Sequence, residues 1–295
     1  MDWETSLNNY YNYISIERNL SNNSIDGYMR DLKQFAKFNK ATNPLKIKRE
    51  NILKYIDHIN KYDINPRSQA RILSSIRSFY TFLIFDNKLD SDPCEHINTP
   101  KIGFKIPIVL TVEEIDKIIS SIDLSEPHGE RNRAIIECLY SCGLRVSELI
   151  TIKISNLIFE DGVVKVIGKG NQQRIVPISK TLEKYLKNYI RFIRSKQKIK
   201  KEHIDTLFLN RNGSQLSRVM IFNIVKQFVK SAGINKKVSP HTFRHSFATH
   251  LVEGGADLRV VQEMLGHVNI TTTEIYTHLN QDYLRQEIVN YHPRA

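Results

Sequence analysis

The stretch from Ser239 to Leu279 reads SPHTFRHSFATHLVEGGADLRVVQEMLGHVNITTTEIYTHL and carries the residues that matter most for this chain. His241 and Arg244 are three residues apart and therefore share one face of a predicted helix. His267 follows in an LGH turn, and Tyr276 lies further on in the same stretch. Imidazoles, a guanidinium and a phenol suit a site that binds a phosphodiester and attacks it with the tyrosine.

The composition describes a globular chain with a marked excess of positive charge. Its 295 residues, 41% hydrophobic and 25% charged, are enough for two compact domains. The formal net charge of +12 favours a polyanionic partner, although a basic protein without such a partner remains an alternative. The opening MDWETSLNNYYNY does not resemble a signal peptide, and no apolar run approaches membrane-spanning length. We therefore expect no membrane partner.

The cysteines are few and odd in number. Cys94, Cys138 and Cys142, in a chain without a secretion signal, predict reduced thiols and a cytoplasmic location. Cys138 and Cys142 are four apart on a predicted helix, and no second cysteine pair follows at zinc-ligand spacing. We interpret both as small buried residues.

Residues 1–92 are predicted to form a helical bundle. Apolar residues recur at helical intervals over residues 2–18, 22–38 and 48–61. The fourth and clearest helix carries an apolar stripe made of Ile72, Ile76, Phe79, Tyr80 and Leu83. Its other side carries three arginines, Arg67, Arg71 and Arg77, which give the bundle a basic face.

Between residues 93 and 108 the helical pattern lapses, because prolines, a glycine and lysines interrupt it, and we expect a linker there. Residues 109–295 form the second predicted domain. It opens with a capping box from Thr111 to Glu114 and changes to strand periodicity at about residues 158–178 before helices resume. The predicted fold is mainly α with a small antiparallel β-sheet: an N-terminal helical bundle followed by an α+β domain.

Two motifs earlier in the chain supply further charged candidates. In GLRVSEL, from Gly143 to Leu149, Arg145 stands at a helix start with Glu148 one turn later. A helix start favours anions, so this arginine fits best if an anion binds there; a surface Arg145–Glu148 pair is the alternative. In GKGNQQR, from Gly168 to Arg174, Lys169 lies in a turn between two predicted strands. It could protonate a leaving oxygen, although most lysines in such turns are simply solvated.

Tyr276 is the residue whose interpretation matters most. Tyrosines are usually packing residues, and an unperturbed phenol is largely protonated and poorly nucleophilic at neutral pH. Cationic neighbours such as Arg145, Arg244 and His267 would stabilise its phenolate. The histidines of this stretch also raise the alternative of a metal site, but they lack a compact ligand pair with a cysteine or carboxylate partner, and Arg244 would repel a cation. His245 and His250 are interpreted as structural.

Together these motifs resemble those of the tyrosine recombinases of the integrase family, and more narrowly the bacterial Xer recombinases that resolve chromosome dimers. The resemblance rests on GLRVSEL, GKGNQQRIVPI, HTFRHSFATHL, LGH, IYTHL and the terminal HPRA. The segment SIERNLSNNSIDGYMRDLKQF is similar to the Xer core-binding domain, so the resemblance extends over the whole chain. It implies a tyrosine-recombinase catalytic domain over residues 109–295, with a C-terminal helix that contacts a neighbouring subunit.

The resemblance also implies which residues bind the phosphate. Arg145 and Arg244 would bind the scissile phosphate and its developing charge. His267 would hydrogen-bond to the same phosphate. Glu148 would orient the site without touching the phosphate itself.

The resemblance further implies the chemistry. Tyr276 would attack the phosphorus to give a 3′-phosphotyrosyl DNA and a free 5′-hydroxyl, whose oxygen Lys169 would protonate. His241 would handle the proton of the tyrosine. No metal, nucleotide or other cofactor would be needed, because the covalent intermediate conserves the energy of the broken bond.

The partners implied by the resemblance are double-stranded DNA with a dif-like recombination site and other recombinase subunits. The chain would act in a tetramer, either with itself or with an XerC-like recombinase, and would be activated by an FtsK-type DNA translocase. The helix predicted over residues 283–291 would dock on a neighbouring subunit; packing on its own domain is the alternative. Two other functions stay open: the integrase of a mobile element, and a basic DNA-binding protein that does not cleave.

Overall fold

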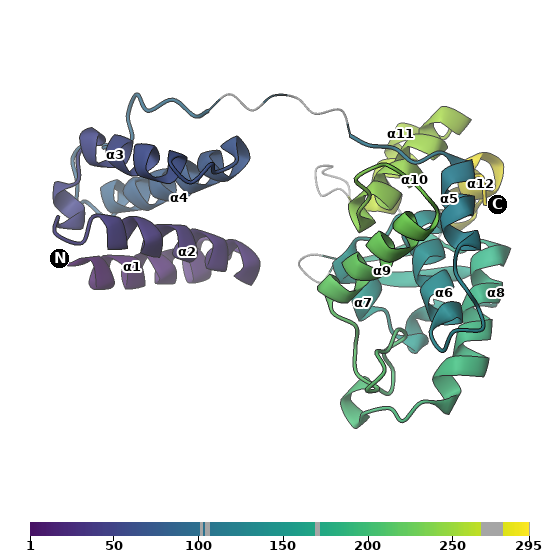
Figure 1. Cartoon of the computed structure of the whole chain (residues 1–295). Coiled ribbons are helices and arrows are strands. Elements are labelled where there is room, and N and C mark those ends of the chain that lie inside the picture. The colour runs from purple at the N-terminus through teal and green to yellow at the C-terminus, as the bar shows by residue number, and fades with distance from the viewer. Residues whose placement is uncertain (101–102, 104–106, 169–171, 267–279, 295) are drawn as a thin grey trace. The chain divides into compact units, whose positions relative to one another are not determined.

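The computed structural model describes residues 1–100, 103, 107–168, 172–266 and 280–294 and divides into two compact units (Figure 1). The first unit is Met1–Lys105 and the second is Ile106–Ala295. Each unit has its own buried apolar core. Cys94 and Ile97, which fall inside the predicted linker, are buried in the core of the first unit. The predicted domain bounds of 1–92, 93–108 and 109–295 stay a prediction.

The first unit is a bundle of helices, as predicted. They are α1 (Trp3–Asn12), α2 (Asn22–Phe38), α3 (Arg49–Asn60) and α4 (Pro66–Phe85), and a π-helical turn, Tyr13–Glu17, continues α1. The helix starts follow from local chemistry: Asp2 Oδ1 accepts a hydrogen bond of 2.8 Å from the Thr5 amide, and Pro66 occupies the first turn of α4. The stripe predicted on the fourth helix is buried in the bundle core.

The predicted basic face of α4 is partly used within the unit itself. Arg71 pairs with Asp31, a buried carboxylate of α2 that also accepts a hydrogen bond of 2.9 Å from Ser75 Oγ. Arg77 donates to the carbonyl of Ile97 and, at 3.1 Å, to Thr99 Oγ1. These arginines therefore hold the bundle and the start of the following segment together.

The second unit contains helices α5 to α12 and a small sheet. The helices are α5 (Val112–Ser120), α6 (Gly129–Ser141), α7 (Val146–Thr151), α8 (Lys180–Asn188), α9 (Arg218–Ser231), α10 (Pro240–Gly254), α11 (Leu258–Leu265) and α12 (Asn280–Tyr291). The capping box at Thr111 is present: Glu114 Oε2 accepts from the Thr111 amide at 2.8 Å, and Thr111 Oγ1 accepts from the Glu114 amide at 3.2 Å. Cys138 and Cys142 are buried free thiols, as predicted.

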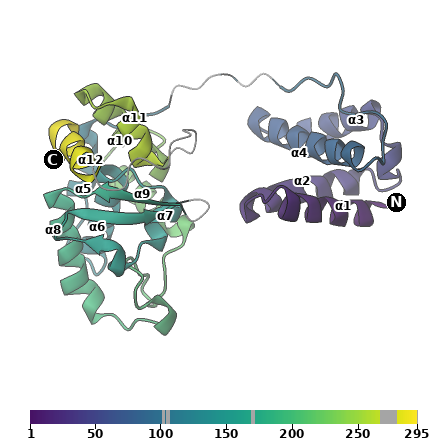
Figure 2. The same cartoon turned by 180° about the vertical axis from the view of Figure 1, so that it is seen from behind.

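The sheet is antiparallel with strand order β1-β2-β3, and Figure 2 shows it from the side opposite to Figure 1. Its strands are β1 (Leu157–Ile158), β2 (Val163–Ile167) and β3 (Gln173–Pro177). The register pairs Val166 with Arg174. Val164, Val166 and Val176 enter the core, so one face of the sheet is packed on the helices. The predicted fold class, mainly α with a small antiparallel sheet, is confirmed.

The C-terminal part of the chain packs on its own unit. α12 contacts β3, α10 and α11, and Ile288 is buried in the core. In the terminal HPRA, the His292 ring lies against Tyr140 and Phe247, and burial lowers its pKa to about 3. Arg294 pairs with Asp116 and, at 3.4 Å, with the buried Glu137. The docking of this helix on a neighbouring subunit stays a prediction.

Candidate functional site

The structure describes four of the predicted site residues: Arg145, Glu148, His241 and Arg244. Outside the described residues lie the other three, Lys169, His267 and Tyr276. The geometry below therefore concerns the charged residues of α7 and α10 and the elements packed against them.

A close approach of two helical segments places Arg244 beside the start of α7. Gly143, in the turn between α6 and α7, has a φ of +54°, and a Cβ there would lie 2.4 Å from Cδ1 of Phe247 on α10. Only glycine fits such a backbone at such a distance. The turn therefore lies directly on α10, and Nη1 of the buried Arg244 donates a hydrogen bond of 2.7 Å to the Gly143 carbonyl.

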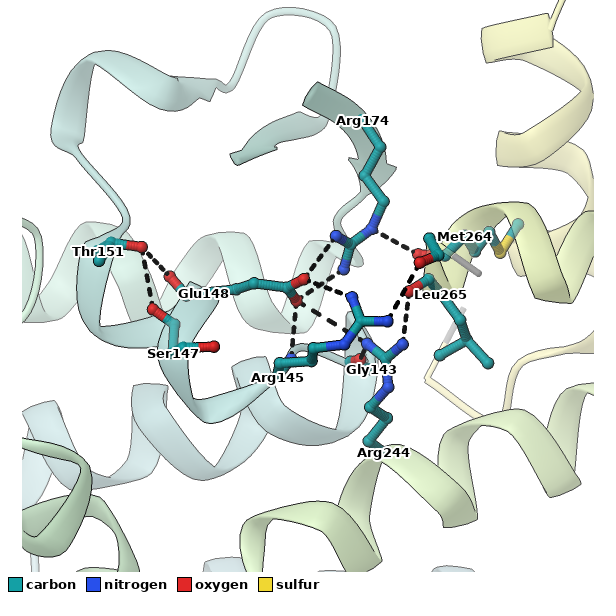
Figure 3. Close-up of polar contacts among 10 residues, drawn as sticks. Gly143, Arg145, Ser147, Glu148, Thr151, Arg174, Arg244, Met264 and Leu265 are labelled. Atoms are coloured by element: carbon teal, nitrogen blue, oxygen red, sulfur yellow. Dashed lines mark hydrogen bonds and ion pairs between the residues drawn. The ribbon is translucent and has the colours of Figure 1, made fainter. Parts of the chain in front are cut away.

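Glu148 is the centre of the charged cluster (Figure 3). Its side chain is 3% exposed, and its carboxylate accepts four hydrogen bonds of 2.8 Å. Two come from the amide and Nη1 of Arg145, and two come from Nη1 and Nη2 of Arg174 on β3. Nη1 of Arg244 is 3.8 Å from Glu148 Oε2, an ion-pair distance but not a hydrogen bond. Three guanidinium groups thus surround one carboxylate.

The same three arginines also reach the C-terminal end of α11. The last carbonyls of a helix have no partner within the helix and carry partial negative charge, so cations bind well there. α11 ends at Gly266, which has a left-handed φ of +64°. Its last carbonyls accept in order: Met264 from Arg174 Nε at 2.8 Å, Leu265 from Arg244 Nη2, and Gly266 from Arg145 Nη2 at 3.1 Å. Residues 267–279 follow directly.

The cluster carries more positive than negative charge. Three guanidinium groups and one carboxylate leave two positive charges among these residues. Burial and the neighbouring charge of Arg145 lower the pKa of Arg244 to about 10. Burial alone would raise the pKa of Glu148, but the hydrogen bonds and charge of Arg174, together with Arg145, lower it to about 2. An anion bound here would relieve the repulsion between the arginines.

The structure corrects the alternative interpretation of Arg145 and Glu148. Glu148 is buried and shared with Arg174, so the two residues are not a surface pair. His241 is exposed on the first turn of α10, whereas Arg244 one turn later is buried. His250 accepts or donates a hydrogen bond of 2.8 Å with Tyr140 Oη, which confirms its structural role. Sequence reasoning missed Arg174, although the GKGNQQR motif ends on it.

The pKa of Glu148 predicts a loss of stability in acid. A carboxylate whose pKa is lowered in the folded state stabilises it above the ordinary glutamate pKa, and this contribution disappears as the pH falls through about 2. Between about pH 5 and pH 2, the free energy of unfolding of wild type should therefore fall by up to about 3 kcal/mol relative to Glu148→Gln. Urea denaturation followed by far-UV circular dichroism measures this difference.

A built-in control comes from the single tryptophan, Trp3, which lies in α1 of the first unit. Its fluorescence reports the first unit and should not distinguish wild type from Glu148→Gln at any pH. A difference between the two proteins that stays constant from pH 6 to pH 2 would show that folding does not lower the pKa of Glu148.

The described residues offer neither a metal site nor a membrane-spanning helix. Within the described ranges, no group of three or more His, Cys, Asp or Glu side chains is arranged to hold a metal ion. Nor does any helix in that part of the chain have the length and apolar character needed to cross a membrane.

Comparison with known families matches both units of the chain. Residues 109–282 match the model "Phage integrase family", and residues 7–87 match "Phage integrase, N-terminal SAM-like domain". The chain is 44% identical to "Tyrosine recombinase XerD" of Staphylococcus haemolyticus, over 99% of this chain and 100% of the relative. It is 41% identical to the XerD of Listeria innocua serovar 6a, over 98% and 99% of the two chains.

Among solved structures, the chain is similar to the XerH site-specific recombinase bound to a palindromic difH substrate in a post-cleavage complex. The TM-score is 0.69 at 26% identity, and the similarity covers 91% of this chain and 80% of that one. The chain therefore belongs to the phage integrase family, as a tyrosine recombinase of the XerD type. The opening segment and the ending of the sequence favour XerD over XerC, and the comparisons bear this out.

Proposed function

We propose that this enzyme binds double-stranded DNA at a dif-like site and cleaves and rejoins it through a 3′-phosphotyrosyl intermediate, and so resolves chromosome dimers. The observation that carries the proposal is the cluster of Arg145, Arg174 and Arg244 around Glu148, with two positive charges in excess. It lies at the end of α11, directly before the segment that contains His267 and Tyr276.

The charge of the cluster suits the chemistry. A phosphodiester carries one negative charge, and the pentacovalent transition state of attack by an oxygen nucleophile carries about two. Two uncompensated arginine charges therefore stabilise the transition state more than the ground state, and this difference accelerates the reaction. Arg145 and Arg244 bind the phosphate in this proposal, and Glu148, which is hydrogen-bonded to Arg145, orients the site without contacting the phosphate.

The remaining roles are assigned to the other residues that the sequence predicts for this site. Tyr276 is the nucleophile, Lys169 protonates the leaving 5′-oxygen, and His267 hydrogen-bonds to the phosphate. His241, exposed at the start of α10, takes the proton of the tyrosine. No metal or organic cofactor takes part.

The proposed partners follow from the same activity. Recombination between two DNA sites needs four active sites, so the enzyme works as a homotetramer or with an XerC-like recombinase. An FtsK-type DNA translocase activates it at the division site. Its location is the cytoplasm, where the three cysteines stay reduced.

A nicked suicide substrate tests the central claim. The substrate carries a dif-like site with a nick placed so that the short strand between the cut and the nick diffuses away after cleavage. Wild type should then remain covalently attached to the DNA and migrate as an adduct on a denaturing gel. Binding to the same DNA without any adduct would identify a DNA-binding protein that does not cleave.

Metal independence is a further expected result. Adduct formation should proceed at an unchanged rate in excess EDTA, because the leaving oxygen is protonated by Lys169 rather than by a metal-bound water. The assay compares the rate with and without chelator on the suicide substrate. Activity that disappears with EDTA and returns with Mg²⁺ or Zn²⁺ would overturn the mechanism.

A further inference from the structure

We propose that Arg174 is a positioning residue: it saturates the carboxylate of Glu148 and so keeps Arg244 available to the DNA phosphate. This inference rests on the proposed function. It assigns a role to Arg174, a largely covered arginine that has no role among those assigned above.

All hydrogen-bond acceptor sites of the Glu148 carboxylate are occupied. A carboxylate has about four lone-pair sites, two on each oxygen. Oε1 accepts from Arg145 Nη1 and Arg174 Nη1, and Oε2 accepts from the Arg145 amide and Arg174 Nη2. Arg174 therefore fills half of the acceptor sites with a bidentate pair, the strongest arrangement for these two groups.

Among the residues that the structure describes, Arg244 forms an ion pair with this carboxylate but no hydrogen bond. Its Nη1 lies 3.8 Å from Glu148 Oε2 and donates to the carbonyl of Gly143 instead. Without Arg174, Oε2 would lose one of its two donors inside a buried site, where an unsatisfied charged acceptor is costly. Arg244 would then shift to form a hydrogen bond with Glu148. Its charge would be neutralised by this carboxylate and would no longer stabilise the phosphate.

Arg174 itself is poorly placed to bind phosphate. Its Nε donates to the Met264 carbonyl at 2.8 Å, and both of its terminal nitrogens donate to Glu148. All three nitrogens are thus engaged with the protein.

The backbone holds Arg174 in this position. It pairs with Val166 across the antiparallel β2–β3 ladder. On its other side it packs against the end of α11, where a Cβ on Gly266 would lie 3.3 Å from both Cδ and Nη1 of Arg174. Contacts with the sheet and with α11 therefore hold the guanidinium in one position, which its proposed role requires.

The first experiment compares two substrates. In a methylphosphonate at the scissile position a methyl group replaces one charged oxygen, so the transition state carries one negative charge less and needs one cation less. Arg174→Ala should slow adduct formation on the ordinary phosphodiester by about 10- to 100-fold. On the methylphosphonate its rate should be within about threefold of wild type, since the charge of the second arginine matters less there.

The matched control is Arg131→Ala. Arg131 is another buried arginine of the second unit, and it donates to the Leu209 carbonyl at 2.9 Å. Its loss should lower the melting temperature and should affect both substrates by the same factor. An equal loss on both substrates for Arg174→Ala as well would overturn the proposal, because a general structural defect does not depend on the charge of the substrate.

The second experiment removes the charge of Glu148. In a Glu148→Gln background there is no carboxylate to capture Arg244, so adding Arg174→Ala should cost little further activity. If Arg174 acted only by tying β3 to α11 through Met264, its loss would cost as much in that background as in wild type, and the proposal would fail. This comparison uses only the phosphodiester substrate. It therefore tests the role of Arg174 even if wild type does not cleave the methylphosphonate.

Failure of the proposed function gives a different result. If wild type forms no adduct on the phosphodiester suicide substrate, the recombinase mechanism itself is wrong. If wild type forms the adduct and Arg174→Ala forms it at the same rate, only the role of Arg174 is wrong.

Discussion

Replacing Tyr276 by phenylalanine is expected to abolish covalent attachment of the enzyme to DNA while leaving DNA affinity nearly unchanged. The substitution removes only the phenolic oxygen, which is the proposed nucleophile, and keeps the ring. The charges that we propose bind the phosphate, those of Arg145 and Arg244, remain in place. The adduct is measured on the nicked suicide substrate, and the affinity by gel shift on the uncut site.

Tyr291→Phe is the matched control for this experiment. Tyr291 lies at the end of α12 and packs against the core of the second unit, so the variant should form adduct like wild type. Adduct that persists in Tyr276→Phe would place the nucleophile elsewhere. Tyr283 and Tyr291 would then be the next residues to replace.

Lys169→Ala should slow cleavage of ordinary DNA by about 10²- to 10⁴-fold, the usual contribution of a general acid. Lys169 falls between β2 and β3 in the sequence, and we propose that it protonates the 5′-oxygen as this leaves. The rate is measured in single turnover on the suicide substrate, with protein in excess, so that DNA binding does not limit it.

A sulfur leaving group separates this role from phosphate binding. A 5′-bridging phosphorothiolate departs without protonation, so it should restore cleavage by Lys169→Ala. It should not restore cleavage by Arg145→Ala, where the defect lies in binding the phosphate. Rescue of neither variant, or of both equally, would mean that the proton comes from another residue.

The fold could be predicted largely from periodicity. The apolar stripe of α4, the capping box at Thr111 and the Val-rich runs of the sheet are local patterns, and the structure places each where the pattern indicates. Details that depend on long-range packing were less accessible. The burial of Cys94 and Ile97 in the first core is one example, because the local sequence there has the character of a linker.

For the site, too, local contacts could be predicted from the sequence and long-range contacts could not. The spacing of Arg145 and Glu148 predicts that they meet, and they do. That Glu148 is buried could not be read from the motif, because its other partner, Arg174, is 26 residues further along the chain. The acceptors on α11 could not be predicted either: they are main-chain carbonyls, which every residue has, and only the fold decides which of them face an arginine.

The use of main-chain carbonyls as acceptors for the arginines affects which substitutions the enzyme tolerates. A side-chain partner is lost by one substitution, but no substitution removes the carbonyl of Met264 or Leu265. Both side chains are buried, so exchanges there are limited by size rather than by charge. Gly266 is different, because its φ of +64° strains any residue with a Cβ, and that Cβ would lie 3.3 Å from Arg174 and force the arginine to shift. Among random variants that retain activity, we expect apolar exchanges at the first two positions and glycine alone at the third.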